Sequence, residues 1–171
     1  YNNEEFIKGT LESIKWGDEI VVVDSYSNDK TVSICESYGA RIVQNKYINS
    51  STQKNWALQF VENEWIFQID SDEKLINDAE TIIRQTIHKV SSDIKCFKME
   101  RRNYLLGKWT KHGGLSPDYQ IRLFNKNYCK WDNRKVHSAI TTKYDIGILG
   151  TPLVHYSVKT ISQPLKNLDR Y

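Results

Sequence analysis

Two short apolar segments of this sequence each end in an aspartate, and both lie between stretches with helical periodicity. The first runs from Glu19 to Asp24, and the second, Trp65 to Ile69, leads into Asp70. Short runs rich in Val, Ile and aromatic residues are typical of buried strands. Strands separated by helices pair in parallel, so their carboxyl ends meet at one edge, where open α/β sheets bind ligands. The pattern predicts an α/β protein with a Rossmann-like, mostly parallel sheet and helices on both faces.

The alternation of helices and strands continues to residue 90 and then stops. Beyond it, strand-like segments follow one another without long helices, and the basic, aromatic stretch 101–114 is expected to be a long loop. We expect one domain over residues 1–159, with an alternating half (1–90) and a mixed strand-and-loop half (91–159), then a helical segment (160–171). A polar turn leads straight into the first helix, so we expect the first strand of the sheet and part of the C-terminal segment to be missing.

Composition excludes several classes of protein. The chain has 171 residues, 39% of them hydrophobic, and a net charge of +3, which gives no reason to expect a nucleic-acid partner. No apolar run is as long as a membrane span. The three cysteines form no CxxC pair, which favours reduced thiols in the cytoplasm and disfavours zinc. No GxGxxG or P-loop lysine motif occurs, so a dehydrogenase or a P-loop NTPase is not expected.

The second aspartate-terminated segment continues as Ile-Asp-Ser-Asp-Glu, which places Asp70, Asp72 and Glu73 directly after the predicted strand. Two carboxylates at such an edge suit a hard divalent cation that in turn holds phosphate oxygens. A solvated acidic turn is the alternative for this pattern taken alone.

Four motifs, in this order and spacing, resemble those of family 2 glycosyltransferases of the GT-A fold: Tyr-Asn-Asn-Glu-Glu, Val-Val-Val-Asp-Ser-Tyr-Ser-Asn-Asp, Gln-Lys-Asn-Trp-Ala and Ile-Asp-Ser-Asp-Glu. Three downstream pieces, Gly-Lys-Trp (107–109), Pro-Asp-Tyr-Gln-Ile-Arg-Leu-Phe (117–124) and Val-His (136–137), resemble the bacterial branch that includes lipopolysaccharide-core β-glucosyltransferases. The resemblance covers roughly residues 1–140. It implies that residues 1–90 bind a nucleotide sugar and residues 91–159 bind the acceptor.

For the donor, the resemblance implies that Glu4 or Glu5, together with Asp24, hold the base and ribose, and that Lys54 lies near the diphosphate. Each position has a structural alternative. Glu4 and Glu5 are favourable charges at a helix N-terminus, Asp24 suits a capping turn, and Lys54 could be a solvated helix charge.

For the metal, the resemblance assigns Asp70 and Asp72 to a DxD motif, with Asp72 the better candidate for direct contact with Mg²⁺ or Mn²⁺. Such an ion neutralises the leaving diphosphate. His137 is the candidate third ligand or a diphosphate contact, although a lone histidine is more often structural. Relatives tend to have Val-His-Glu here, whereas this chain has Ser138, which puts part of the site in doubt.

For the chemistry, family 2 enzymes invert the anomeric centre, so a carboxylate must take a proton from the acceptor hydroxyl. Asp118 is the candidate base, with Glu73 as its rival and a Pro-Asp turn as the structural alternative. Tyr104 and Trp109 are candidates for stacking against an acceptor sugar, or for core packing.

These expectations combine into a metal-dependent inverting glycosyltransferase that uses a nucleotide diphosphate sugar, expected to be UDP-linked. The expected acceptor is a bacterial cell-surface glycan such as lipopolysaccharide core, or a lipid-linked sugar. The expected location is the cytoplasm, with peripheral contact at the inner membrane face. Three alternatives stay open: a peptide or protein glycosyltransferase, an inactive nucleotide-binding module, and a nucleotidyltransferase.

Overall fold

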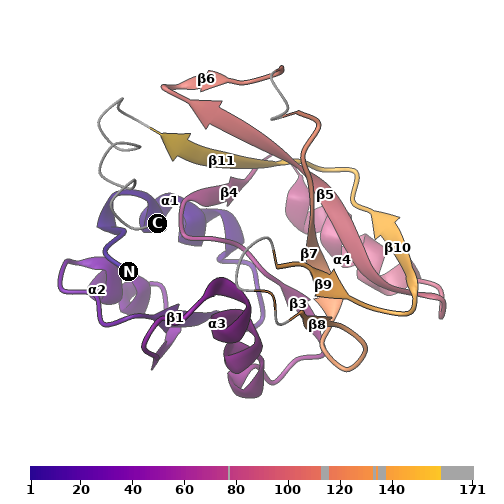
Figure 1. Cartoon of the computed structure of the whole chain (residues 1–171), viewed down its shortest axis with the longest axis horizontal. Coiled ribbons are helices and arrows are strands. Elements are labelled where there is room, and N and C mark those ends of the chain that lie inside the picture. The colour runs from indigo at the N-terminus through magenta and orange to yellow at the C-terminus, as the bar shows by residue number, and fades with distance from the viewer. Residues whose placement is uncertain (77, 113–115, 133, 135–137, 159–171) are drawn as a thin grey trace.

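The computed structural model describes residues 1–76, 78–112, 116–132, 134 and 138–158 (Figure 1). The candidate ligand His137 and the C-terminal segment 160–171 lie outside the described residues.

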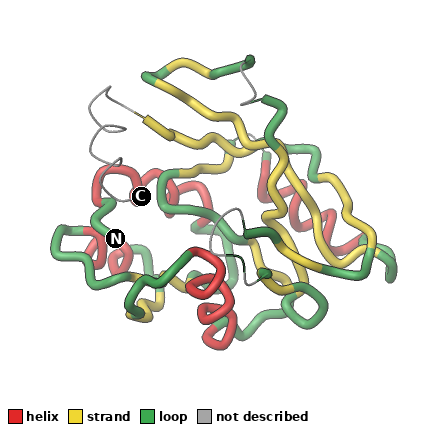
Figure 2. The backbone as a smooth tube through the Cα atoms, viewed as in Figure 1, coloured by secondary structure: helices red, strands yellow, loops and turns green. Residues whose placement is uncertain are grey.

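The N-terminal part alternates helices and strands, as the apolar pattern predicts (Figure 2). Strands β1 and β2 pair in parallel, with Val21 opposite Arg41. Helices α1 and α2 pack together through a core cluster of Ile7, Leu11 and Cys35. The elements are α1 (Glu4–Ile14), β1 (Val21–Asp24), α2 (Thr31–Ser37), β2 (Arg41–Gln44), α3 (Ser50–Ala57) and η1 (Leu58–Phe60).

The rest of the chain builds a mixed sheet around the long strand β5. Its order is β3-β7-β5-β11-β4, with β6 and β10 also paired to β5. Strands β10 and β11 run parallel to β5, whereas β7 runs antiparallel to it. The elements are β3 (Trp65–Phe67), β4 (Glu73–Leu75), α4 (Ala79–Lys89), β5 (Ile94–Leu105), β6 (Lys108–Trp109), β7 (Tyr119–Asn125), β8 (Lys130–Trp131), β9 (Ile140–Thr141), β10 (Asp145–Ile148) and β11 (Leu153–Val158).

The prediction that residues 101–114 form a long loop is wrong for the first part of this stretch. Strand β5 continues to Leu105 and returns as β6 after a two-residue turn, Leu106–Gly107, in which both residues have positive φ (51° and 77°). This is the turn geometry that joins tight hairpins. The polar residues of this stretch suggested a loop, but Arg101 and Asn103 are paired with acidic and polar groups from neighbouring strands. Because these partners satisfy their polar groups, both side chains can lie in a strand.

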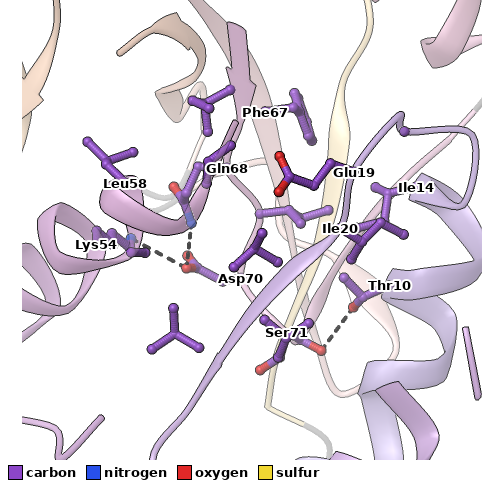
Figure 3. Close-up of a pocket in the computed structure, with 18 of the residues that line it drawn as sticks. Thr10, Ile14, Glu19, Ile20, Lys54, Leu58, Phe67, Gln68, Asp70 and Ser71 are labelled. Atoms are coloured by element: carbon purple, nitrogen blue, oxygen red, sulfur yellow. Dashed lines mark hydrogen bonds and ion pairs between the residues drawn. The ribbon is translucent and has the colours of Figure 1, made fainter. Parts of the chain in front are cut away.

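A cavity of about 530 Å³ lies between β1 and β3, with α1 and α3 at its sides. Among the described strands, β1 pairs only with β2, and β3 pairs only with β7, so each has one edge without a strand partner. The inner walls of the cavity are mainly apolar, and Lys54 and Asp70 also line it (Figure 3). No helix in the described part of the chain is both long and apolar enough to cross a membrane.

Candidate functional site

The segment that follows β3 is the centre of the polar cluster. Gln68 and Asp70 face α3 across the rim of the cavity, and Asp70 lies 3.4 Å from the Nζ atom of Lys54 (Figure 3). Ser71 receives a hydrogen bond from the Asn3 side chain just before α1, at 2.5 Å. The segment also contacts Arg122 of β7 and His155 of β11, so it joins both halves of the chain.

Arg122 is a buried cation in the middle of β7, with 3% of its side chain exposed. Its guanidinium donates to Gln68 Oε1, to Asp70 Oδ2 at 3.0 Å and to Glu73 Oε1. Glu73 is completely buried in β4 and also accepts from the backbone N–H of Asp70 at 3.1 Å. A buried charge is tolerated when it is paired in this way. Arg122 therefore fixes the acids that follow β3.

The titration of these groups follows from burial and charge. Burial by itself would raise the pKa of Asp70, but the charges of Arg122 and Lys54 outweigh it and hold that pKa well below its ordinary value. Burial raises the pKa of Glu73, against the opposing effect of Arg122. Burial lowers the pKa of Lys54, against the attraction of Asp70. Asp70 is therefore ionised at neutral pH, and Lys54 supplies a cation beside it.

Asp118, the candidate base, directly precedes β7, and its backbone carbonyl accepts from the backbone N–H of Arg101 in β5 at 2.7 Å. Arg101 donates to its Oδ2 atom from Nε at 2.8 Å and lies 2.7 Å away at Nη2. Asn103 Nδ2 donates to the same oxygen at 3.1 Å, and Gln120 Nε2 donates to Oδ1 at 2.7 Å. Burial would raise the pKa of Asp118, but these hydrogen bonds and the charge of Arg101 lower it. The carboxyl is therefore ionised and held in a fixed orientation.

A histidine that the sequence did not single out faces the DxD segment. His155 in β11 places Nε2 3.5 Å from Asp72 Oδ2, and its Nδ1 atom is 2.8 Å from Asn103 Oδ1. The Asn103 amide donates to Asp118 through Nδ2, so its oxygen faces His155 and accepts the Nδ1 proton. With Nδ1 bonded to Asn103, the Nε2 atom of His155 faces the Asp72 carboxylate, an arrangement that could hold a shared cation.

The acids expected to hold the base and ribose gather around the N-terminus of α1. Asp24 is buried at the end of β1 and accepts from the Ser27 N–H at 2.9 Å and the Ser27 hydroxyl at 2.5 Å. Glu4 is exposed and accepts from the backbone N–H of Lys30 at 2.9 Å, and Glu5 is exposed. Asn3 is bonded to both Thr31 and Ser71. Asn3 therefore links the start of α1 to the DxD segment, while the contacts of Asp24 and Glu4 also fit their structural alternatives.

The acceptor candidates Tyr104 and Trp109 are cross-strand partners in the β5–β6 hairpin. The Trp109 ring is contacted by two cations, the Arg102 guanidinium 4.5 Å from its centroid and the Lys111 ammonium 4.6 Å from it. Its Nε1 atom is buried with no hydrogen-bond partner in the described structure. The Tyr104 ring contacts Tyr156 at 5.8 Å between centroids.

Sequence reasoning missed the residues that neutralise and orient the acids of this site: Gln68, Asn103, Gln120, Arg122 and His155. The sequence offered one indication for Arg122, which is that it lies inside the apolar segment 121–124. A charged side chain is stable in a buried strand only when it is paired with polar or oppositely charged groups. His155 lies one residue beyond the strand predicted over residues 148–154, whereas the structure places it in β11. Only the pairing of β11 with β4 and β5 shows what it faces.

Taken together, the fold and the site define an α/β protein whose clustered acids and cations at strand ends suit a phosphorylated ligand. The profile of the family described as "Glycosyl transferase family 2" matches residues 1–143, so the chain belongs to that family. The suspected family is thereby confirmed.

Two relatives of similar sequence come from bacteria. The chain is 29% identical over 187 residues to an uncharacterized glycosyltransferase of Rickettsia bellii (strain RML369-C), covering 99% of this chain and 62% of that protein. It is 26% identical over 177 residues to the lipopolysaccharide core biosynthesis glycosyltransferase LpsC of Rhizobium meliloti (strain 1021), covering 99% of this chain and 65% of that protein. The chain thus spans a little under two-thirds of the length of these relatives.

The fold is similar to that of S. aureus TarS. A crystal structure of TarS residues 1–349 superposes with a TM-score of 0.61 at 19% identity, covering 92% of this chain and 58% of that one. A structure of the same TarS segment in complex with UDP-GlcNAc gives a TM-score of 0.50 at 25% identity, covering 61% of this chain and 33% of that one. The predicted GT-A fold class is confirmed.

Proposed function

We propose that the protein containing this chain transfers a sugar from a UDP-linked donor to a bacterial cell-surface glycan, with inversion at the anomeric carbon. The observation that carries the proposal is a continuous set of contacts from Lys54 through Asp70, Arg122, Glu73 and Arg101 to Asp118. It links the expected donor half to the candidate base. The UDP-GlcNAc in the TarS complex supports the nucleotide, and the name of the LpsC relative supports the acceptor class.

The donor diphosphate would lie beside Lys54 and the acids after β3. Asp72 and His155 fit a divalent ion, since one offers a carboxylate and the other an imidazole nitrogen oriented by Asn103. No group of three or more His, Cys, Asp or Glu side chains suited to a metal occurs among the described residues. Mg²⁺ is commonly held by one or two carboxylates plus substrate phosphates, so a site with few protein ligands is consistent with the proposal. When bound, Mg²⁺ or Mn²⁺ would neutralise charge on the leaving diphosphate.

In the transfer step, the acceptor hydroxyl oxygen forms a bond to the anomeric carbon as the bond from that carbon to the diphosphate oxygen breaks. The hydroxyl proton passes to the Asp118 carboxylate, which is ionised and positioned by Asn103 and Gln120. Glu73 is less suited to this role because its carboxyl is completely buried and paired with Arg122.

Calorimetric titration with UDP, GDP and dTDP, each with and without Mn²⁺, tests the donor site. We expect UDP to bind most tightly, in a manner that needs both Mn²⁺ and Asp72. Asp72→Ala should abolish the metal-dependent part, whereas Asp93→Ala, a change in an exposed loop, should leave it intact. Failure of every nucleotide to bind would overturn the donor assignment.

A transfer assay with UDP-sugars and core oligosaccharide acceptors tests the reaction. Asp118→Ala should reduce transfer by at least about 100-fold, the usual range for loss of a general base, while UDP binding is preserved. Transfer that is unchanged in both Asp118→Ala and Asp72→Ala would show that the site assignment is wrong.

A further inference from the structure

We propose that Arg101 is a receptor for an anionic group of the acceptor, a phosphate monoester or a carboxylate, and that binding this group releases Asp118 to act as the base. The inference rests on the proposed function, because it names the acceptor class for that same site. Arg101 and Asp118 form an ion pair inside the protein, and an acceptor anion would replace Asp118 in it.

In this ion pair the Arg101 guanidinium contacts only one of the two carboxylate oxygens of Asp118. Nε and Nη2 of Arg101 both approach Oδ2 of Asp118, at 2.8 and 2.7 Å. The favoured arrangement between a guanidinium and an anion is bidentate, with two nitrogens on two different oxygens. Oδ1 of Asp118 is instead taken by Gln120, at 2.7 Å. A ligand that offers two free oxygens would therefore pair with Arg101 better than Asp118 does.

Arg101 is also the cation best placed to meet a ligand here. Its side chain is 24% exposed, whereas that of Arg122 is 3% exposed and committed to three partners. Arg102, the next residue, contacts Glu100 at 3.1 Å and the Trp109 ring. The Nη1 atom of Arg101 is 3.7 Å from Glu73, which Arg122 already neutralises. Arg101 can therefore exchange its anionic partner while Glu73 stays paired with Arg122.

Release of Arg101 would change the basicity of Asp118 while keeping its position. The two neutral amides of Asn103 and Gln120 would still hold both carboxylate oxygens, at 3.1 and 2.7 Å. Removing the nearby positive charge makes a carboxylate a stronger proton acceptor. An acceptor with an anion near its hydroxyl would therefore activate the base as it binds, whereas water or a neutral sugar would leave Asp118 paired.

The test is titration of the purified protein with methyl phosphate and, separately, with acetate, in EDTA and without nucleotide. The NMR signal of the Arg101 Nε–H group reports binding at this position and separates it from binding elsewhere. Asp118→Asn removes the competing charge but keeps the shape of the side chain. We expect this variant to bind the better of the two anions at least about fivefold more tightly than wild type, in line with the loss of one ion pair.

Two further variants make the result decisive. Arg101→Gln should weaken the same binding at least about tenfold, and Arg102→Gln, the matched neighbour, should change it less than about twofold. Equal affinity in wild type and Asp118→Asn, or full binding in Arg101→Gln, would overturn the proposal. Comparison of the two probes shows whether phosphate or carboxylate is preferred.

The outcome is independent of the donor experiment, because it needs neither metal nor nucleotide. Anion binding with the expected pattern in a protein that binds no UDP would refute the proposed function and keep Arg101 as an anion site. UDP and metal binding with no anion response would refute the anion site at Arg101 and keep the proposed function.

Discussion

The Nε2 atom of His155 lies 3.5 Å from Oδ2 of Asp72, although one residue is in β11 and the other follows β3. Asn103 orients the imidazole through Nδ1, at 2.8 Å. The contact brings the end of the described chain to the DxD segment, and it makes His155 a candidate metal ligand within the described residues. His137, the candidate from the sequence, lies outside them and stays a prediction.

This contact predicts a loss of metal affinity when His155 is changed. His155→Gln should weaken Mn²⁺ binding in the presence of UDP at least about tenfold, because one ligand nitrogen is replaced by a poorer donor. Water-proton relaxation measures the binding. His88→Gln, at an exposed position in α4, is the matched control and should have no effect. Unchanged Mn²⁺ affinity in His155→Gln would contradict the assignment.

The local part of the fold was predictable because local sequence determines it. The run of three valines that becomes β1 favours a strand by its own composition, and β2 follows the helix that Gly39 terminates, at a φ of 72°. The long-range part was not predictable in this way. Arg101 and Asn103 look like loop residues until the segment before β7 supplies Asp118, and Glu73 looks like part of an acidic turn until Arg122 neutralises it.

The residues of the site show the same difference between local and long-range sequence information. Asp70 and Asp72 could be identified as a pair because one strand end presents both. Arg122 and His155 come from distant strands, and their roles depend on sheet register, which single-sequence patterns do not specify. The sequence therefore indicated the acids of the site more readily than the residues that orient and neutralise them.

The ion pairs of Asp70 predict a stability difference that depends on pH. Its pKa is lower in the folded protein than in the unfolded chain, where it is about 4. Such a carboxyl stabilises the fold fully above that value, and the stabilisation is lost as the pH falls toward the folded pKa. Wild type should therefore exceed Asp70→Asn in denaturant midpoint at about pH 6, and the gap should narrow toward about pH 3.

The control for this experiment is Asp18→Asn, because Asp18 is 76% exposed and its contact with Arg84 is 3.6 Å long. An exposed ion pair contributes little, so its midpoint should track that of wild type at every pH. A gap between wild type and Asp70→Asn that does not change with pH would show that Asp70 contributes through shape rather than charge.

Gly147 in β10 is required by the packing of Phe97. A Cβ atom at this position would lie 2.3 Å from Cδ1 and 2.4 Å from Cε1 of the Phe97 ring, which is buried in the main core. Gly147→Ala should therefore destabilise the protein by about 1–3 kcal/mol, the usual cost of overpacking. Gly150→Ala is the matched control, since a Cβ there meets no atom within 4 Å. Chemical denaturation of both variants measures the difference, and equal stability would disprove the clash.

The hairpin turn between β5 and β6 contains a residue poorly suited to its backbone. Leu106 has a φ of +51° and is 48% exposed, so it adopts a left-handed conformation without burying its side chain. This conformation is costly for most L-residues, whereas Asn tolerates it and Asn-Gly is the preferred sequence for such a turn. Leu106→Asn should therefore raise the free energy of unfolding by about 0.5–1 kcal/mol.

The neighbouring leucine makes this prediction specific to backbone conformation. Leu105 is 41% exposed and lies in β5 without a positive φ, so Leu105→Asn gains nothing from the turn and loses strand propensity. It should leave the protein no more stable than wild type. Thermal unfolding of the two variants side by side distinguishes the cause. If both substitutions raise the midpoint equally, loss of exposed apolar surface accounts for the gain, and the strain at Leu106 does not.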